Sequence, residues 1–245
     1  IIEGTTLLVN KLIPTRNHGE YQYLNLLQHI MDVGDVRMDR TQTGTKSVFG
    51  EKMEFDLRDG FPLLTTKRTW FTGIKKELLF FISGKTDTKI LEVQGVNIWK
   101  GNTSKAFLEK SKLPWREGDM GPGYSHQWRH AGALYHGCDA DYQGQGVDQL
   151  AELIHGIKND PYGRRHIIDS WSVPDIKDMA LPPCHCFVQF YVSNNELGQP
   201  TFLDCLLHQR SADMFLGVPF NIASYSMLLL IVAHITGLTA RKFIH

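Results

Sequence analysis

A cysteine preceded by two prolines is the residue of this sequence best suited to act as a nucleophile. Pro182 and Pro183 restrict the backbone immediately before Cys184. The residues after it alternate between two faces, with Cys186, Val188, Phe190 and Val192 on one and His185, Phe187, Gln189 and Tyr191 on the other. This pattern predicts a strand with both faces covered. Cys184 is therefore expected where a stiff turn meets a rigid strand.

A thiol attacks as its thiolate, which a nearby cation stabilises, and Arg210 is the candidate cation. The alternative is that Cys184 is a small buried hydrophobic residue. A zinc site is disfavoured, because paired zinc ligands are usually two to four residues apart and no second pair follows. Direct help from His185 as a base is also disfavoured, since adjacent strand residues point to opposite faces.

A carboxylate lies within an apolar helical pattern that runs from about Trp70 to Ser83 and ends at Gly84. The carboxylate belongs to Glu77, and its neighbours are Ile74, Leu78, Leu79, Phe80 and Phe81. Burial would raise the pKa of Glu77, as a proton-handling group near neutral pH requires. The alternative is a solvent-exposed Glu77 beside Lys76.

Three further polar features could bind a ligand or serve only the fold. The loop from Asp39 to Thr45 contains Arg40. It is suited to bind an anion, or it is an ordinary turn with no ligand. Arg164 and Arg165 form a pair at a strand start, where a solvated strand edge is the simpler interpretation. Asn221, near a helix start, offers both a donor and an acceptor, or caps the helix.

The hydrophobic periodicity predicts a mixed α/β protein. Helices are expected over about 23–34, 70–83, 147–157 and 219–236, and strands over about 48–57, 166–172, 185–193 and 201–208. Residues 1–19 are interpreted as an N-terminal extension or linker, and 20–245 as one catalytic domain. Because the chain begins with Ile1, we expect it to be a piece of a longer polypeptide.

The bulk composition limits the partners. The 26 basic and 26 acidic residues cancel, so no global field attracts nucleic acid or an anionic membrane. Four cysteines are too few for a disulfide scaffold, and reduced thiols fit a cytoplasmic location. The longest apolar run, Met227 to Ala233, is shorter than the roughly 20 residues that span a bilayer. We expect a buried helix there and no membrane contact.

Several longer motifs closely resemble the thymidylate synthase family, in order, over roughly residues 20 to 245. They are Asp39-Arg40-Thr41, Phe61-Pro62-Leu63-Leu64-Thr65-Thr66-Lys67-Arg68, Glu117-Gly118-Asp119-Met120-Gly121-Pro122, Gln127-Trp128-Arg129-His130, Arg164-Arg165, Leu181-Pro182-Pro183-Cys184-His185, Gln209-Arg210-Ser211-Ala212-Asp213 and Gly217-Val218-Pro219-Phe220-Asn221-Ile222-Ala223-Ser224-Tyr225.

The resemblance implies an α/β (α+β) fold with one large bent mixed β-sheet, helices packed on one face, and a homodimer formed through the sheets. It implies methylation of dUMP to dTMP with 5,10-methylenetetrahydrofolate as co-substrate, release of dihydrofolate, and no metal. The two other hypotheses are a dUMP hydroxymethylase, in which water captures the methylene and no dihydrofolate forms, and a non-catalytic homologue.

The resemblance also assigns roles to individual residues. The family pattern places catalysis on Cys184, Glu77, Tyr124, Asn221 and Asp213. Nucleotide contacts fall on Arg40, Gln209, Arg210, Ser211 and Asn221, with Arg164 and Arg165 reaching the partner's site. Folate contacts fall on Trp99, Asp213, Gly217 and Phe220.

Some positions depart from the family pattern. A related deoxycytidylate-modifying family has Asp where Asn221 stands, so Asn221 favours uracil over cytosine. The departures are Gln42, Lys100, Ser172, Leu206 and His208. The family's sugar-binding segment and C-terminal tail, which would follow His245, are absent from this sequence, so we expect either a truncated chain or an incomplete cleft.

Overall fold

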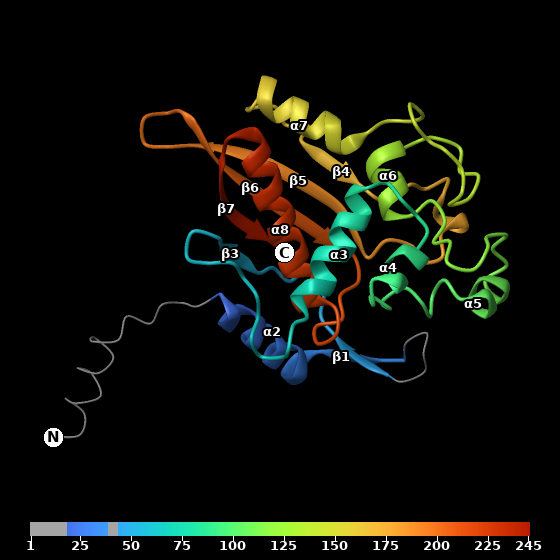
Figure 1. Ribbon diagram of the computed structural model, residues 1–245. Coiled ribbons are helices and arrows are strands. Elements are labelled where there is room, and N and C mark those ends of the chain that lie inside the picture. Colours follow the sequence, from blue (N-terminus) through green and yellow to red (C-terminus); the bar gives the residue numbers. More distant parts are fainter. Residues whose placement is uncertain (1–18, 39–43) are drawn as a thin grey trace. The chain divides into compact units, whose positions relative to one another are not determined.

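The computed structural model describes residues 19–38 and 44–245 (Figure 1). The chain divides into two units, Ile1–Phe55 and Asp56–His245.

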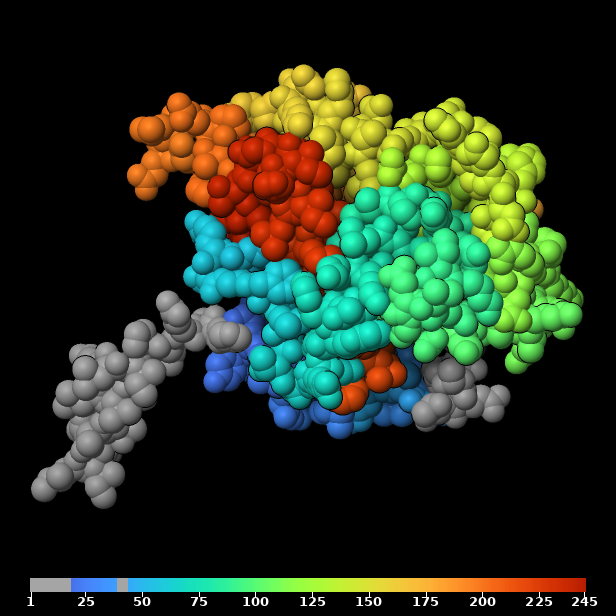
Figure 2. All heavy atoms as spheres, viewed as in Figure 1, coloured from blue at the N-terminus to red at the C-terminus, as the bar shows by residue number. Residues whose placement is uncertain are grey.

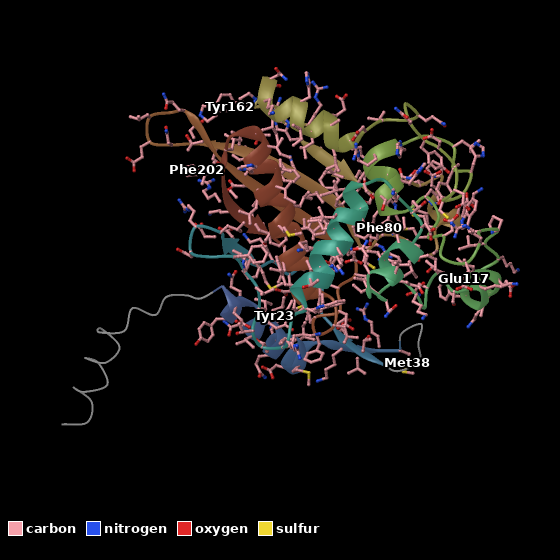
Figure 3. All side chains as sticks on the ribbon, viewed as in Figure 1. Tyr23, Met38, Phe80, Glu117, Tyr162 and Phe202 are labelled. Carbon is pink, nitrogen blue, oxygen red and sulfur yellow. The ribbon has the colours of Figure 1, made fainter. Side chains whose placement is uncertain are left out.

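The first unit contains one helix and a short hairpin. Helix α2 (Glu20–Val33) confirms the predicted helix and buries Tyr23, which Figure 3 labels. Strands β1 (Asp35–Arg37) and β2 (Thr45–Ser47) pair in antiparallel fashion. Of the strand predicted over 48–57, only β3 (Glu54–Asp56) forms, because Gly50 adopts a φ of 83° that interrupts an extended chain.

Four strands form the sheet of the second unit. In spatial order they are β7 (Thr239–Ile244), β6 (Pro200–Gln209), β5 (His185–Asn194) and β4 (Ile167–Asp169). β4, β5 and β6 pair in antiparallel fashion, whereas β6 and β7 are parallel. The sheet is therefore mixed, as expected, and the parallel pair is joined through a crossover helix.

The two faces of β5 differ. Cys186, Val188, Phe190 and Val192 are all buried, as the alternation predicts. On the other face Tyr191 is 63% exposed, and Leu206 on the adjacent β6 is 41% exposed. Within the single chain the second face of β5 is thus only partly covered, and its full covering stays a prediction.

Helix α8 (Val218–Thr236) forms the centre of the second unit (Figure 1). It packs on β6, β7 and helix α3 (Phe71–Ile82), and Gly237 ends it with a φ of 75°. The helix, with 19 residues, is long and apolar enough to cross a membrane, but 61% of its most apolar stretch is buried inside the protein. A core helix accounts for that composition.

Shorter helices complete the second unit. They are α4 (Lys89–Val93), α5 (Lys105–Lys110), α6 (Tyr124–His130), α7 (Gln149–Asn159) and the 3₁₀ turn Ile176–Asp178. Asp148 caps α7 by accepting the N–H of Ala151. Tyr162, just beyond α7, donates to Asn194 in the β5–β6 hairpin, and Figure 2 shows these two segments adjoining at the surface.

Candidate active site

Cys184 lies between Pro183 and the first residue of β5, as the sequence predicts. Its backbone N–H donates to the hydroxyl of Tyr124 at 2.8 Å, and its carbonyl accepts the N–H of Arg210 at 2.8 Å. The residue is half-buried. Two hydrogen bonds from different elements thus fix the backbone of the candidate nucleophile at a partly exposed position.

The guanidinium of Arg210 lies beside this sulfur, with Nη2 3.9 Å from Sγ. Its Nε donates to the Pro183 carbonyl at 2.8 Å and its Nη2 to the Pro182 carbonyl at 3.0 Å. The two prolines therefore have a second role, because their carbonyls, which accept no helical or sheet bond here, hold the cation next to the thiol. The predicted pairing of Cys184 with Arg210 is present.

Tyr124 begins α6, although the sequence suggested only a turn there. Its ring stacks on His185 with centroids 4.2 Å apart and on Phe81 at 4.9 Å. Burial is the main cause that raises the pKa of Tyr124 far above its ordinary value. Its hydroxyl therefore stays protonated and can donate a hydrogen bond while it accepts the N–H of Cys184.

Glu77 lies on α3, and its carboxylate accepts the indole N–H of Trp99 at 2.8 Å. Desolvation raises the pKa of Glu77 to about 7, against the opposing effect of that hydrogen bond. Lys76 instead donates to the Gln94 carbonyl, so the alternative of a Glu77–Lys76 pair is not observed. The raised pKa agrees with the expected desolvation of Glu77, and its proton-handling role stays a prediction.

His185 is a site residue for which no role is predicted from the sequence. Its Nδ1 lies 2.5 Å from the hydroxyl of Tyr225 on α8, and burial lowers its pKa to about 3. A neutral imidazole bonded to Tyr225 is no base for Cys184, in agreement with the strand argument. Its adjacency to the nucleophile could have suggested this stacking role.

Gln209 and Asn221 form a second polar group at the end of β6. Gln209 Nε2 donates to Asn221 Oδ1 at 3.2 Å and to the Ser211 carbonyl at 2.9 Å, and its Oε1 lies 2.8 Å from His245 Nε2. Asn221 is not the helix cap, because α8 begins at Val218. Its amide oxygen is thus part of this polar group rather than a helix cap.

The predicted folate residues lie around the turn that precedes α8. Asp213 is exposed, and its Oδ1 accepts the N–H groups of Phe215 and Leu216 at 3.0 and 2.7 Å. Gly217 precedes α8, and the Phe220 ring lies 5.3 Å from Lys67 Nζ. Trp99 is instead held at Glu77, and its ring is 6.0 Å from that of Tyr124.

Of the remaining predicted anion ligands, Ser211 adjoins this group, whereas Arg164 and Arg165 line a separate cavity. Arg164 and Arg165 are exposed and border a cavity of about 920 Å³ that is lined mainly by α7 and by the segment between α7 and β4. Ser211 is exposed directly after Arg210. Arg40 lies outside the described residues, so its predicted role stays a prediction.

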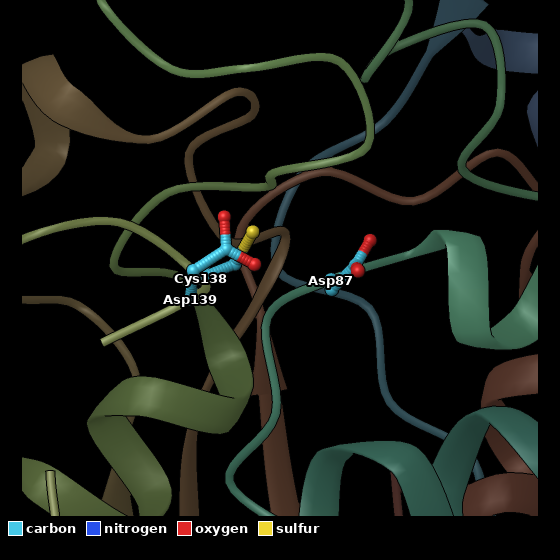
Figure 4. A group of neighbouring side chains, drawn as sticks. All are labelled: Asp87, Cys138 and Asp139. Atoms are coloured by element: carbon cyan, nitrogen blue, oxygen red, sulfur yellow. The ribbon is translucent and has the colours of Figure 1, made fainter. Parts of the chain in front are cut away.

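An acidic group elsewhere has the side chains of a cation site. Asp87, Cys138 and Asp139 place their ligand atoms within 4.8 Å of one another (Figure 4). Arg116 already pairs with both carboxylates, at 2.9 Å to Asp87 and 2.6 Å to Asp139. Burial and the nearby carboxylates raise the pKa of Cys138 to about 12, so its thiol is no ready metal ligand.

The mixed sheet and the cysteine beside a fixed guanidinium define a class: α/β enzymes with a nucleophilic thiol and an anion-binding arginine. The chain belongs to the thymidylate synthase family, whose model, described as "Thymidylate synthase", matches residues 21–245.

Named relatives agree with this membership. A bifunctional dihydrofolate reductase-thymidylate synthase 2 of Arabidopsis thaliana is 55% identical over 229 residues, which cover 93% of this chain and 40% of that protein. Thymidylate synthase of Agaricus bisporus is 55% identical over 230 residues, covering 93% and 78%. That of Candida albicans is 52% identical over 243 residues, covering 94% and 77%. The chain thus spans less than half of the bifunctional relative.

Proposed function

We propose that this chain transfers a methyl group to dUMP, giving dTMP and dihydrofolate from 5,10-methylenetetrahydrofolate. Family membership gives the reaction class, and the single observation that carries the proposal is the position of Arg210 Nη2, 3.9 Å from Cys184 Sγ. One guanidinium there can stabilise a thiolate and bind a phosphate, because it presents several N–H donors in a planar fork.

The Cys184 thiolate would add to carbon 6 of the uracil, which makes carbon 5 nucleophilic. Negative charge on the ring oxygen would be met by the Asn221 amide and by the carboxyl of Glu77, the latter through ordered water. A carboxyl whose pKa is about 7 can give and take a proton near neutrality. The Tyr124 hydroxyl, which stays protonated, would help to position the acceptor of the proton that leaves carbon 5.

Methylenetetrahydrofolate would supply the one-carbon unit and the hydride that reduces it. The donor set near α8 fits such a ligand, because the exposed Asp213 carboxylate can accept N–H groups of a heterocycle and the Phe220 ring can pack against it. Trp99 and Gly217 complete the predicted folate contacts. The role of these residues would be to bind and orient this co-substrate.

We further propose a cytoplasmic homodimer, in which Arg164 and Arg165 of each subunit bind the phosphate in the other subunit's site. The exposure of Tyr191 and Leu206 on the open sheet face supports such pairing. The balance of charge favours neither nucleic acid nor membrane as a partner.

The test is the rise of dihydrofolate absorbance on mixing the protein with dUMP and methylenetetrahydrofolate. A rise that Cys184→Ala abolishes would support methylation. If hydroxymethyl-dUMP formed without dihydrofolate, the chain would be a hydroxymethylase instead. Covalent trapping of Cys184 by a fluorinated dUMP analogue would exclude a purely non-catalytic role.

A further inference from the structure

Trp171, two residues after β4, supplies an aromatic face to Arg210. The guanidinium carbon of Arg210 lies 5.2 Å from the centroid of the Trp171 ring. This is inside the range of about 6 Å in which a cation is attracted to an aromatic face, and tryptophan is the strongest such partner. Trp171 is 37% exposed, so it lies at the surface rather than in the protein core.

The loop that carries Trp171 is fixed independently of Arg210. The Trp171 N–H donates to Asp169 Oδ1 at 2.8 Å. Ser172 Oγ donates to Asp175 Oδ2 at 2.7 Å, and Gln127 Nε2 donates to the same oxygen at 2.9 Å. The structure thus gives Ser172, a departure from the family pattern, a place in this loop. These bonds hold the backbone of the loop from which the indole projects toward Arg210.

Arg210 itself is an exposed residue at the end of β6. A long side chain in such a place loses rotamer entropy when it is fixed, so its position beside Cys184 requires several contacts. The Pro182 and Pro183 carbonyls hold the guanidinium along its N–H edge. The Trp171 ring is the contact that restrains its flat face.

We propose that Trp171 is a positioning residue that holds the Arg210 guanidinium beside the Cys184 sulfur and thereby sets the reactivity of that thiol. The same restraint would present Arg210 to the nucleotide phosphate, a second consequence that rests on the proposed function. The first consequence does not depend on turnover and can be measured on the thiol alone.

The other ionisable groups near Cys184 allow its reactivity to be measured over pH. His185 has a pKa of about 3 and Tyr124 a strongly raised one, so neither changes charge between pH 6 and 9. Glu77, which lies on α3, has a pKa of about 7, so its titration adds the same step to the pH profile of every variant.

The experiment compares Trp171→Leu, Trp171→Phe and Val173→Ala in the full chain. Val173, on the same loop and 76% exposed, is the matched control for general disturbance of the loop. Iodoacetamide alkylation of Cys184 is followed by peptide mass spectrometry. The other thiols react slowly near neutrality, since burial raises the pKa of Cys138, Cys186 and Cys205.

We expect Trp171→Leu to slow alkylation at pH 7.5 about three- to tenfold, the range that loss of one cation–π contact allows, and to move the pH profile upward. Phe keeps a flat ring face, so Trp171→Phe should stay within about twofold of the parent. Val173→Ala should match the parent. Thermal unfolding is recorded for all variants to separate reactivity from stability.

The decisive comparison repeats Trp171→Leu in an Arg210→Gln background. If Trp171 acts through Arg210, the substitution has no further effect on alkylation there. An equal slowing in both backgrounds, or a lowered unfolding temperature with an unchanged pH profile, would overturn the proposal. If alkylation responds as expected but no dTMP forms, the positioning role stands and the proposed methyl transfer fails.

Discussion

At the scale of single residues, the carboxyl of Glu77 makes stability depend on pH. The pKa of this carboxyl is about 7 in the folded protein, whereas an unperturbed glutamate has a pKa of 4.5. The difference arises because burial penalises the charged form. Between these values the folded state binds more protons than the unfolded state, so stability falls as pH rises from 4.5 to 7. A shift of this size corresponds to at most about 3 kcal/mol.

Glu77→Gln keeps an acceptor for the Trp99 N–H but removes the titration. The variant should therefore gain stability relative to the parent as pH rises from 5 to 8, by up to about 3 kcal/mol. Urea unfolding of both proteins at pH 5, 6.5 and 8 measures this difference. A difference that is constant across these pH values would show that the Glu77 carboxyl is not shifted by burial.

The site residues were predictable from sequence where chemistry and local pattern coincide. A stiff turn before a strand is predicted by the sequence Pro182-Pro183-Cys184. A carboxylate within an apolar helix is predicted by the neighbours of Glu77. The contact of Arg210 with Trp171 was not predictable, because it joins two loops 39 positions apart (171 and 210) through the pairing of β4, β5 and β6. Tertiary packing, not spacing, brings them together.

At the scale of elements, α8 illustrates which helices a sequence reveals. Its long apolar composition predicted a buried helix, and the structure confirms it. Strand β7, after Gly237, was missed because residues 239–244 include Arg241 and Lys242 and show no clean alternation. The Arg241 side chain is accommodated there by a pair with Asp204 on the neighbouring strand β6.

Adjacent leucines on α8 provide a matched pair of substitutions. Leu229 is fully buried, whereas Leu230 is 41% exposed. Leu229→Ala should destabilise the protein by about 2–5 kcal/mol, because it leaves a cavity as well as losing apolar contact. Leu230→Ala has the same change in helix propensity and should cost less than about 1 kcal/mol. Equal unfolding midpoints in urea would contradict the packing of α8 described here.

At the scale of the whole molecule, the open face of the sheet predicts self-association. Tyr191 and Leu206 lie on this face and are 63% and 41% exposed. A self-complementary face of a two-fold dimer would bury both. Leu206→Lys places a charge within that contact and should convert dimer to monomer in sedimentation velocity. Leu197→Lys, on the exposed β5–β6 hairpin at 82% exposure, is the control and should leave the mass unchanged.

The arginine pair makes the dimer testable through activity. If Arg164 and Arg165 serve the partner's site, a Cys184→Ala subunit and an Arg164→Ala/Arg165→Ala subunit can complement each other, because each heterodimer contains one intact site. Random exchange at equal amounts makes half the dimers mixed, so about a quarter of all sites would be intact. We therefore expect mixed inactive variants to regain about a quarter of parental dTMP formation. If both arginines acted within their own subunit, every site would keep one defect and mixing would restore nothing.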